Sequence, residues 1–199
     1  MVYETIEIEK RHKGVTWVYI NHPPVNAIDD RLMFELEQIA DQLEKDEETR
    51  VIVLASRHEK VFLAGADLKS LMAGIESSGD GVDPIKAQSE RMQECFHRFA
   101  ILAKPVVAAI NGHALGGGCE LALACDFRIM SAGKIGLTEL SLGMIPGAGG
   151  TQRMVETVGR AQAIDLIFHA KQLTKEEQKT LLSLISRVQK HSEKKFLNK

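Results

Sequence analysis

The chain has 199 residues, of which 44% are hydrophobic and 26% charged, and its formal net charge is −2. This is the composition of a globular protein with one good core, and the near-neutral charge gives no basic footprint for nucleic acid or for an anionic membrane. Three cysteines without CxxC spacing, no signal-peptide pattern and no apolar run of bilayer length predict a soluble cytoplasmic protein in a reducing compartment.

The first quarter of the chain predicts a hairpin, a helix and a buried strand. Residues 3–9 alternate and residues 15–20 are rich in β-branched and aromatic side chains, so both are expected to be strands. Asp29 or Asp30 can cap a helix that runs to about residue 44. Residues 51–55 are wholly apolar, which is typical of a parallel strand covered on both faces. This order predicts βαβ units with right-handed crossovers.

The next segment predicts a strand that turns into a helix. Residues 61–63 end a strand, and the chain turns through Ala64-Gly65-Ala66 into a helix begun by Asp67. Such a turn exposes backbone donors at the edge where open α/β sheets bind ligands, although a plain strand-to-helix connection is the alternative. Residues 72–84 are polar and glycine-rich and are expected to form a mobile loop, and residues 85–102 a helix.

The central stretch carries the features that point to chemistry. Residues 106–110 read as a buried strand, and three glycines, Gly116 to Gly118, then lead into a helix that ends near Ala124. The first N–H groups of a helix lack intrahelical partners and lie at the positive end of its dipole. Bare glycine backbone here could hold an oxygen that gains negative charge, whereas the plainer interpretation is a tight turn or a close-packing site.

Two glutamates accompany this predicted oxyanion site. Glu120 lies one helical turn after Gly117 and therefore shares its helix face. Glu139 follows in a segment bounded by glycines, which predicts a loop. A glutamate near a helix start is often only a dipole partner, but two carboxyls near one oxyanion site indicate paired general acid and base chemistry.

The last part of the chain predicts a second glycine-rich turn followed by helices. Residues 143–150 form the turn, and the helices are expected at 151–158, 160–169 and 174–182. Thr174 and Glu177 have capping-box spacing. A short strand at 185–188 and a lysine-rich tail follow, and the tail is either a solvated end or a contact for a phosphorylated ligand.

Several enzyme classes are excluded by missing motifs. The sequence contains no GxxxxGK[ST] and no GxGxxG that opens a helix near the N-terminus, so a P-loop and a dinucleotide fold are not predicted. It also lacks GxSxG, and its seven histidines show no HExxH or paired spacing. We therefore expect neither a serine hydrolase nor a metal site.

Taken together, the motifs resemble the crotonase superfamily and, within it, the enoyl-CoA hydratases. The matching segments occur in family order over about residues 5–190, and they are His22-Pro23-Pro24-Val25-Asn26-Ala27, Ala64-Gly65-Ala66-Asp67-Leu68, Lys104-Pro105-Val106, Asn111-Gly112, Leu115-Gly116-Gly117-Gly118-Cys119-Glu120-Leu121, Cys125-Asp126, Glu139 and Ile145-Pro146-Gly147-Ala148-Gly149-Gly150-Thr151-Gln152-Arg153. The resemblance implies an α/β crotonase-like spiral of ββα units, in which two roughly perpendicular sheets are wrapped by helices. It also implies an acyl-CoA substrate, a homotrimer or hexamer, and no cofactor beyond the coenzyme A of the substrate.

The resemblance further implies roles for individual residues. The thioester oxygen would lie between the N–H groups of Ala66 and Gly117, and Glu120 and Glu139 would match the catalytic pair of the hydratases. Coenzyme A would contact the residues of the strand-to-helix turn and its surroundings, namely Ala64, Ala66, Asp67, Leu68, Lys69 and Gly117. The implied reaction is reversible hydration of a 2-enoyl-CoA to a 3-hydroxyacyl-CoA in fatty-acid or related acyl-CoA catabolism. We assign activation of water to Glu120 and protonation of C2 to Glu139.

The resemblance predicts a catalytic core over residues 1–190 and a short basic tail over 191–199. Family members continue through C-terminal helices that close the acyl pocket and build the trimer, so the chain is expected to lack this region, with altered oligomerisation or stability. Two alternatives stay open at this point. One is an isomerase or another crotonase-type acyl-CoA enzyme, and the other is a truncated, inactive CoA-binding subunit.

Overall fold

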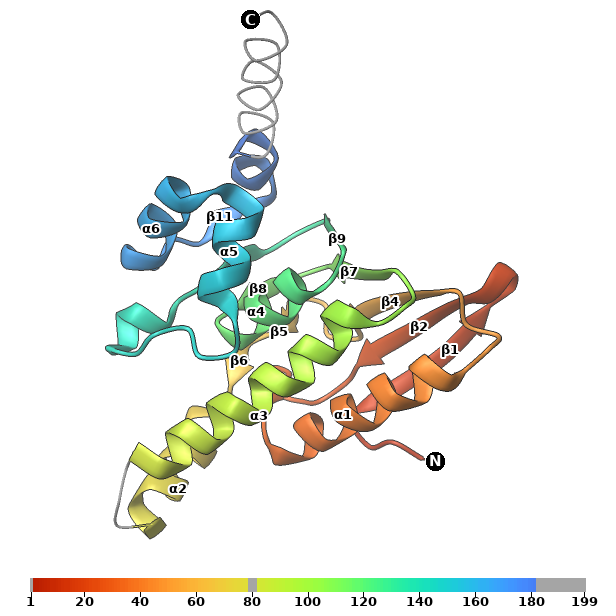
Figure 1. The fold of residues 1–199 in the computed structure, drawn as a ribbon, viewed down its shortest axis with the longest axis horizontal. Helices are drawn as coiled ribbons and strands as arrows, with labels where there is room; N and C mark the ends of the chain where they lie inside the picture. Colours follow the sequence, from red (N-terminus) through yellow and green to blue (C-terminus); the bar gives the residue numbers. More distant parts are fainter. Residues whose placement is uncertain (1, 79–81, 182–199) are drawn as a thin grey trace, which may run out of the picture.

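The computed structural model describes residues 2–78 and 82–181 of the chain. These residues form a five-stranded sheet, a four-stranded sheet and a two-stranded pair, with helices around them (Figure 1). The predicted mixed α/β class is therefore confirmed. The strand expected at residues 185–188, the tail, the boundary at residue 190 and the last residue of the helix expected at 174–182 lie outside the described residues.

The larger sheet has the strand order β1-β2-β4-β7-β9. Its strands are β1 (Ile6–Arg11), β2 (Val15–Ile20), β4 (Val51–Ser56), β7 (Val106–Ile110) and β9 (Phe127–Met130). β1 and β2 pair antiparallel across the short 3-10 turn η1 (His12–Gly14), which confirms the predicted hairpin. All further pairs in this sheet are parallel, as the βαβ pattern predicted.

The remaining strands are only two or three residues long and were not all predicted. The four-stranded sheet has the order β11-β10-β8-β5, and the separate pair is β3 with β6. The bounds are β3 (Ala27–Ile28), β5 (Val61–Leu63), β6 (Gly65–Ala66), β8 (His113–Leu115), β10 (Lys134–Gly136) and β11 (Leu173–Thr174). Only β5 was expected, because so few residues cannot show the alternation that marks a strand.

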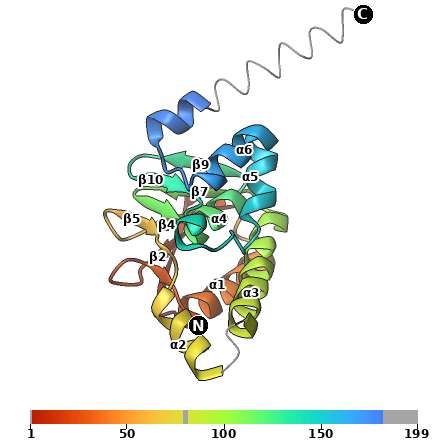
Figure 2. The ribbon, with the colours of Figure 1, turned by 90° about the vertical axis from the view of Figure 1, so that its left-hand side faces the viewer.

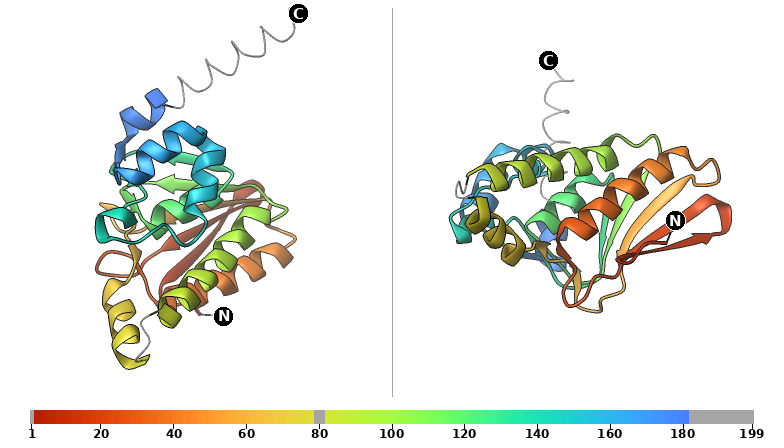
Figure 3. Two further views of the ribbon diagram at one scale, coloured as in Figure 1. Left: turned by 60° about the vertical axis from the view of Figure 1, so that its left-hand side comes forward. Right: turned by 90° about the horizontal axis from the view of Figure 1, so that it is seen from below.

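Helices α1 (Asp30–Lys45) and α3 (Val82–Ile101) run side by side over one face of the larger sheet (Figures 1 and 3). α1 begins where predicted, because Asp29 Oδ1 accepts a hydrogen bond of 2.9 Å from Leu32 N. Apolar side chains at helical spacing on both helices are buried, namely Leu32, Leu36, Ile39 and Leu43 of α1 and Met92, Phe96 and Phe99 of α3. These two helices therefore close the core on that face.

The loop expected at residues 72–84 is wrong where the structure describes it. Helix α2 (Leu68–Ser78) continues through the first part of this segment and α3 already begins at Val82 (Figure 2). Asp67 caps α2, since its carboxylate accepts bonds from Lys69 N at 3.1 Å and from the Ser70 hydroxyl at 2.7 Å. Pro84 lies in the first turn of α3, where its missing N–H is tolerated.

Helix α4 (Gly117–Ala124) is the centre of the molecule. All eight of its residues are buried, and it contacts α3, α5, β5, β6 and β8. Helices α5 (Gly150–Val158) and α6 (Arg160–Phe168) follow in the C-terminal part, close to the ranges expected for them. Thr174 and Glu177 form the predicted capping box before a helical stretch over residues 175–181. Among the described helices, none combines the length and apolarity needed to cross a bilayer.

Candidate active site

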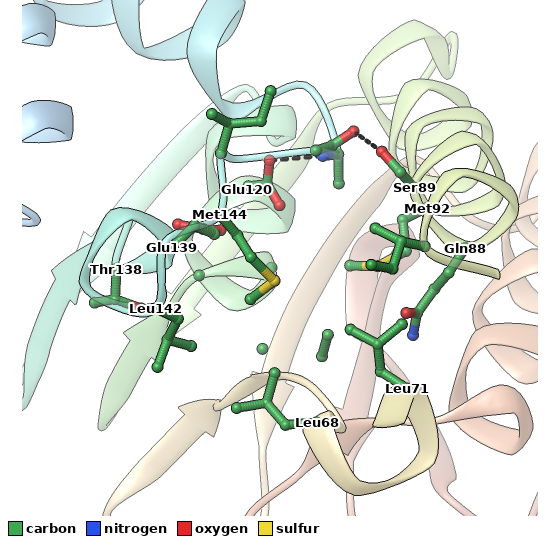
Figure 4. A pocket seen from close by; sticks show the side chains of 18 of the residues that line it. Leu68, Leu71, Gln88, Ser89, Met92, Glu120, Thr138, Glu139, Leu142 and Met144 are labelled. Atoms are coloured by element: carbon green, nitrogen blue, oxygen red, sulfur yellow. Dashed lines mark hydrogen bonds between the residues drawn. The ribbon is translucent and has the colours of Figure 1, made fainter. Parts of the chain in front are cut away.

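Most of the residues singled out in the sequence converge on one cavity of about 150 Å³. Three segments that are distant in the sequence build it: the turn from β6 into α2, the start of α4, and the chain from residue 138 to residue 148. Helix α3 supplies a further wall (Figure 4). Six of the eight predicted site residues line it, and they are Ala64, Ala66, Leu68, Gly117, Glu120 and Glu139.

The glycine run lets α4 start deep inside the protein. Gly116 has a φ of 52°, a left-handed conformation that favours glycine. At Gly118 an added Cβ would lie 2.1 Å from the carbonyl oxygen of Leu63, so only glycine permits α4 to approach β5 this closely. The first turn of α4 thereby lies at the cavity with its N–H groups at the helix start. The plainer close-packing interpretation is thus confirmed at Gly118, whereas an oxyanion role for the helix start stays a prediction.

The turn from β6 into α2 lies directly against this helix start. A Cβ added to Gly65 would lie 3.3 Å from Gly117 N, which places the two backbone segments in contact. β6 is held in place by pairing with β3, in which Ala66 is opposite Ile28. Asn26 is buried and supports this pair, because its side-chain amide donates to the Ser56 hydroxyl at 2.8 Å and to Phe62 O at 3.1 Å. Ala66 and Gly117 therefore face the same space from two rigid segments.

Glu120 is almost fully buried, with 2% of its surface exposed. One carboxylate oxygen, Oε1, accepts hydrogen bonds from Ala148 N at 2.8 Å and from Gly150 N at 2.9 Å. The other oxygen points into the cavity (Figure 4). Burial raises the pKa of Glu120, and the two backbone donors oppose this increase. The side chain is therefore fixed at one oxygen and available at the other.

Glu139 begins the 3-10 turn η2 (Glu139–Leu142), which replaces the loop expected here, and Gly143 ends the turn with a φ of 72°. Burial raises the pKa of Glu139 to about 7, and the negative charge of Glu120 adds to this effect. The Oε2 atom of Glu139 is buried and has no hydrogen-bond partner within the described part of the chain. Near neutral pH this carboxyl can therefore carry a proton that is free to be donated to a bound molecule.

The segment from Gly147 to Gly150 is held by three side chains, of which only Arg153 lies in a motif named from the sequence. Ser89 Oγ and Gln93 Nε2 each donate to Gly147 O at 2.7 Å. From the other side, Arg153 Nη1 donates to Ala148 O at 3.0 Å. The only sequence signal for the first two residues is their spacing of four on one helix, which many surface side chains share.

The cavity also has an apolar wall that the sequence did not predict. It consists of side chains from α2, α3, η2 and the chain after η2, namely Leu71, Ile85, Met92, Leu142, Met144 and Ile145. Met92 shares helical spacing with the buried Phe96 and Phe99 of α3, so it belongs to both the core and the cavity wall. An apolar wall beside two carboxyls fits a ligand with a hydrocarbon part next to its reacting group.

Two of the predicted binding residues do not line the cavity. Asp67 uses its carboxylate to cap α2, and the side chain of Lys69 is exposed in the first turn of that helix, beside Leu68. A role for Lys69 at the phosphates of coenzyme A stays a prediction. Within residues 2–78 and 82–181, no group of three or more His, Cys, Asp or Glu side chains is arranged to hold a metal ion.

Comparisons with known proteins agree with this geometry. Residues 10–193 match the family described as "Enoyl-CoA hydratase/isomerase". The chain is 38% identical over 197 residues to a short-chain-enoyl-CoA hydratase of Clostridium acetobutylicum, covering 97% of this chain and 72% of that protein. It is 43% identical over 149 residues to a probable enoyl-CoA hydratase of Bacillus subtilis, covering 74% of this chain and 55% of the relative.

The fold is similar to solved structures as well. An enoyl-CoA hydratase from Bacillus anthracis aligns with a TM-score of 0.80 and 32% identity, over 98% of this chain and 78% of that one. An enoyl-CoA hydratase from Geobacillus kaustophilus gives a TM-score of 0.82 at 28% identity, over 98% and 75% of the two chains. The chain thus spans between about half and three quarters of the length of these relatives.

Proposed function

The chain belongs to the enoyl-CoA hydratase/isomerase family, and from its site we propose that it reversibly adds water to 2-enoyl-CoA thioesters to give 3-hydroxyacyl-CoA. One observation carries this proposal. Glu120 and Glu139 both line the cavity that the glycine start of α4 opens onto, and Glu139 has a pKa of about 7. Hydration needs a carboxylate to activate water and a carboxyl to protonate carbon, so this pair supplies both groups.

The proposed binding mode places the thioester oxygen between the N–H groups of Ala66 and Gly117. The contact between their two backbone segments supports it, since both residues then line one small cavity. As water adds to the conjugated double bond, negative charge moves onto this oxygen in an enolate. Each well-aligned donor stabilises such charge by roughly 3–4 kcal/mol. The apolar wall would hold the acyl chain, and Lys69 would lie near the phosphates of coenzyme A.

The two glutamates divide the proton transfers. Glu120 accepts a proton from water through its free oxygen while the water oxygen bonds to C3. The enolate then takes the proton of Glu139 at C2, so water is added with no net change in charge. The raised pKa of Glu139 favours the donor role, because about half of this carboxyl is still protonated near pH 7. In the reverse reaction, the two residues exchange roles.

Acid–base chemistry by these glutamates suffices for the proposed reaction, so the only cofactor we propose is the coenzyme A within the substrate. We also propose that the chain assembles as a homotrimer or hexamer. Exposed apolar side chains on the edge strand β9, Phe127 and Ile129, support an assembly because they leave a hydrophobic strip uncovered in one copy. Sedimentation velocity of the purified chain measures the assembly directly.

Hydration is tested with crotonyl-CoA, whose conjugated absorbance is lost when water adds. Wild-type protein should turn it over, and Glu120→Gln and Glu139→Gln should each lower kcat by about 100-fold or more, consistent with the loss of a general acid or base. An isomerase would depend mainly on one of the two residues and would shift a 3-enoyl-CoA without needing water. If folded wild-type protein binds crotonyl-CoA but leaves its absorbance unchanged, the proposed function is wrong.

A further inference from the structure

Helix α3 contributes two polar side chains whose donors are directed at backbone rather than at the ligand. We propose that Ser89 and Gln93 are positioning residues for Glu120, because they fix the peptide group that binds its carboxylate. This inference rests on the proposed function for its kinetic consequences. Its structural core, a hydrogen-bonded connection from α3 to Glu120, does not.

The connection passes through a single peptide group. Ser89 Oγ and Gln93 Nε2 both donate to the carbonyl oxygen of Gly147 at 2.7 Å. The N–H of the same peptide group belongs to Ala148, and it donates to Glu120 Oε1 at 2.8 Å (Figure 4). A peptide group is planar, so its C=O and N–H cannot turn independently. Two donors that fix the oxygen of this group therefore also fix the direction of the N–H at Glu120.

The same arrangement strengthens the bond to the carboxylate. A carbonyl oxygen that accepts hydrogen bonds polarises its peptide group, and the N–H opposite becomes a better donor. Two donors on Gly147 O thereby make Ala148 N–H a stronger partner for a negative charge. This matters because burial raises the pKa of Glu120 while Ala148 and Gly150 lower it. The two side chains of α3 thus favour the ionised form that activates water.

The location of these side chains argues against a mainly structural role. Gln93 is exposed, and hydrogen bonds that water can replace contribute only about 1 kcal/mol to stability. Ser89 lies at the cavity wall, but its hydroxyl bonds to Gly147 O. The segment of Gly147 to Gly150 contains three glycines, so its backbone is intrinsically permissive and gains most from such restraints.

The primary test compares wild-type protein with the double variant Ser89→Ala/Gln93→Leu. We expect kcat for crotonyl-CoA hydration to fall about 10- to 100-fold with little change in KM, because small misplacement of a catalytic group has effects of this size. The pKa of Glu120 should rise by about half a unit to one unit in the double variant. This pKa is measured by ¹³C-carboxyl NMR of glutamate-labelled protein, and the Glu120 signal is assigned by its loss in Glu120→Gln. The acidic limb of the pH–rate profile should move in the same direction.

Matched variants separate positioning from folding. Ser89→Thr keeps the hydroxyl and should retain most of the activity, whereas Glu94→Ala changes an exposed side chain of the same helix and should leave kcat unchanged. Each single variant keeps one donor on Gly147 O and should show a smaller effect than the pair, which preserves the test if the double variant does not fold. A Cβ at residue 147 would lie 2.6 Å from Ser89 Oγ, so Gly147→Ala should lower kcat as well. The double variant Gly147→Ala/Ser89→Ala should lose less kcat than the two single variants would together predict. The reason is that the steric clash at residue 147 and the hydrogen bond to Gly147 O both involve the Ser89 hydroxyl.

The proposal is overturned if the pKa of Glu120 and kcat both stay at wild-type values in the folded double variant. It is also overturned if Ser89→Thr loses as much activity as Ser89→Ala. The NMR measurement of the Glu120 pKa does not require the protein to be catalytically active. If wild-type protein does not hydrate crotonyl-CoA, the proposed function fails, and the pKa of Glu120 in the double variant still decides whether α3 acts on this carboxylate.

Discussion

The partly buried carboxyl of Glu139 should make the stability of the protein fall as the pH rises. Its pKa is about 7 in the folded chain, against an ordinary value of 4.5. Below pH 4.5 it is protonated in both folded and unfolded states. Between pH 4.5 and 7 the unfolded chain ionises first, so the unfolded state gains relative stability. The stability linked to this proton is complete below pH 4.5 and is lost as the pH passes 7.

The magnitude follows from the difference in pKa. A difference of about two and a half units corresponds to about 3 kcal/mol as an upper limit, because each unit is worth about 1.4 kcal/mol and Glu139 keeps some contact with solvent. Glutamine cannot ionise, so Glu139→Gln should lack this loss. The free energy of unfolding of the variant minus that of the wild type should therefore increase by about 2–3 kcal/mol from pH 4.5 to pH 8.

Urea unfolding at a series of pH values measures this difference. Subtracting the two curves cancels the titration of all groups that the substitution leaves alone. Glu120 is coupled to Glu139, so the pair Glu120→Gln and Glu120→Gln/Glu139→Gln should be compared in the same way. A difference between wild type and Glu139→Gln that stays constant from pH 4.5 to 8 would refute a raised pKa at this carboxyl, and with it the reason for assigning it the proton-donor role.

Three further substitutions test the geometry of the site and the fold. Gly118→Ala would place a Cβ 2.1 Å from the carbonyl oxygen of Leu63, so we expect a loss of several kcal/mol in urea unfolding, or no folded protein; wild-type stability would contradict the close approach of α4 to β5. Gly117→Ala would place a Cβ 2.8 Å from Met92 Cε and should lower kcat, and Met92→Ala in the same chain should restore part of it; equal activity of the single and double variants would contradict this contact. Asp29→Ala removes the cap of α1 and should cost about 1 kcal/mol of stability without changing kcat per folded molecule, which thermal unfolding and the crotonyl-CoA assay check together.

The sequence predicted the parts of the fold that repeat a pattern over many residues. The hairpin followed from alternating and β-branched residues, and β4 and β7 followed from continuous apolar runs. Helix α1 followed from its capping aspartate, and the helix start at Gly117 from the glycine run. The loop expected at residues 72–84 was wrong for the described residues 72–78 and 82–84. The segment contains three glycines and several polar residues, which hide the helix that the Asp67 cap begins and that packs on α3. Strand β9 was missed because its four residues are too few to show a clear alternation. In the structure its Phe127 and Ile129 side chains are 60% and 65% exposed.

The candidate site was predictable where it depends on unusual residue combinations. A triple glycine followed by Glu120 is rare enough to draw attention, and the structure places Glu120 and Glu139 on the same cavity. The surroundings that give Glu120 and Glu139 different pKa values and different hydrogen-bond partners were not predictable from the sequence. The raised pKa of Glu139 depends on burial and on the charge of Glu120, and the bonds to Glu120 come from backbone 28 and 30 residues away.

Helix α4 carries both a proposed backbone donor and a proposed catalytic carboxylate, and none of its residues reaches the surface. Every neighbour of such a helix constrains its sequence, so a substitution there disturbs packing on several sides at once. Under the proposed function, a new acyl preference would therefore evolve at the cavity walls that α2, α3 and the chain after η2 form around this helix. Relatives with different substrates should diverge at those walls while the central helix stays nearly unchanged.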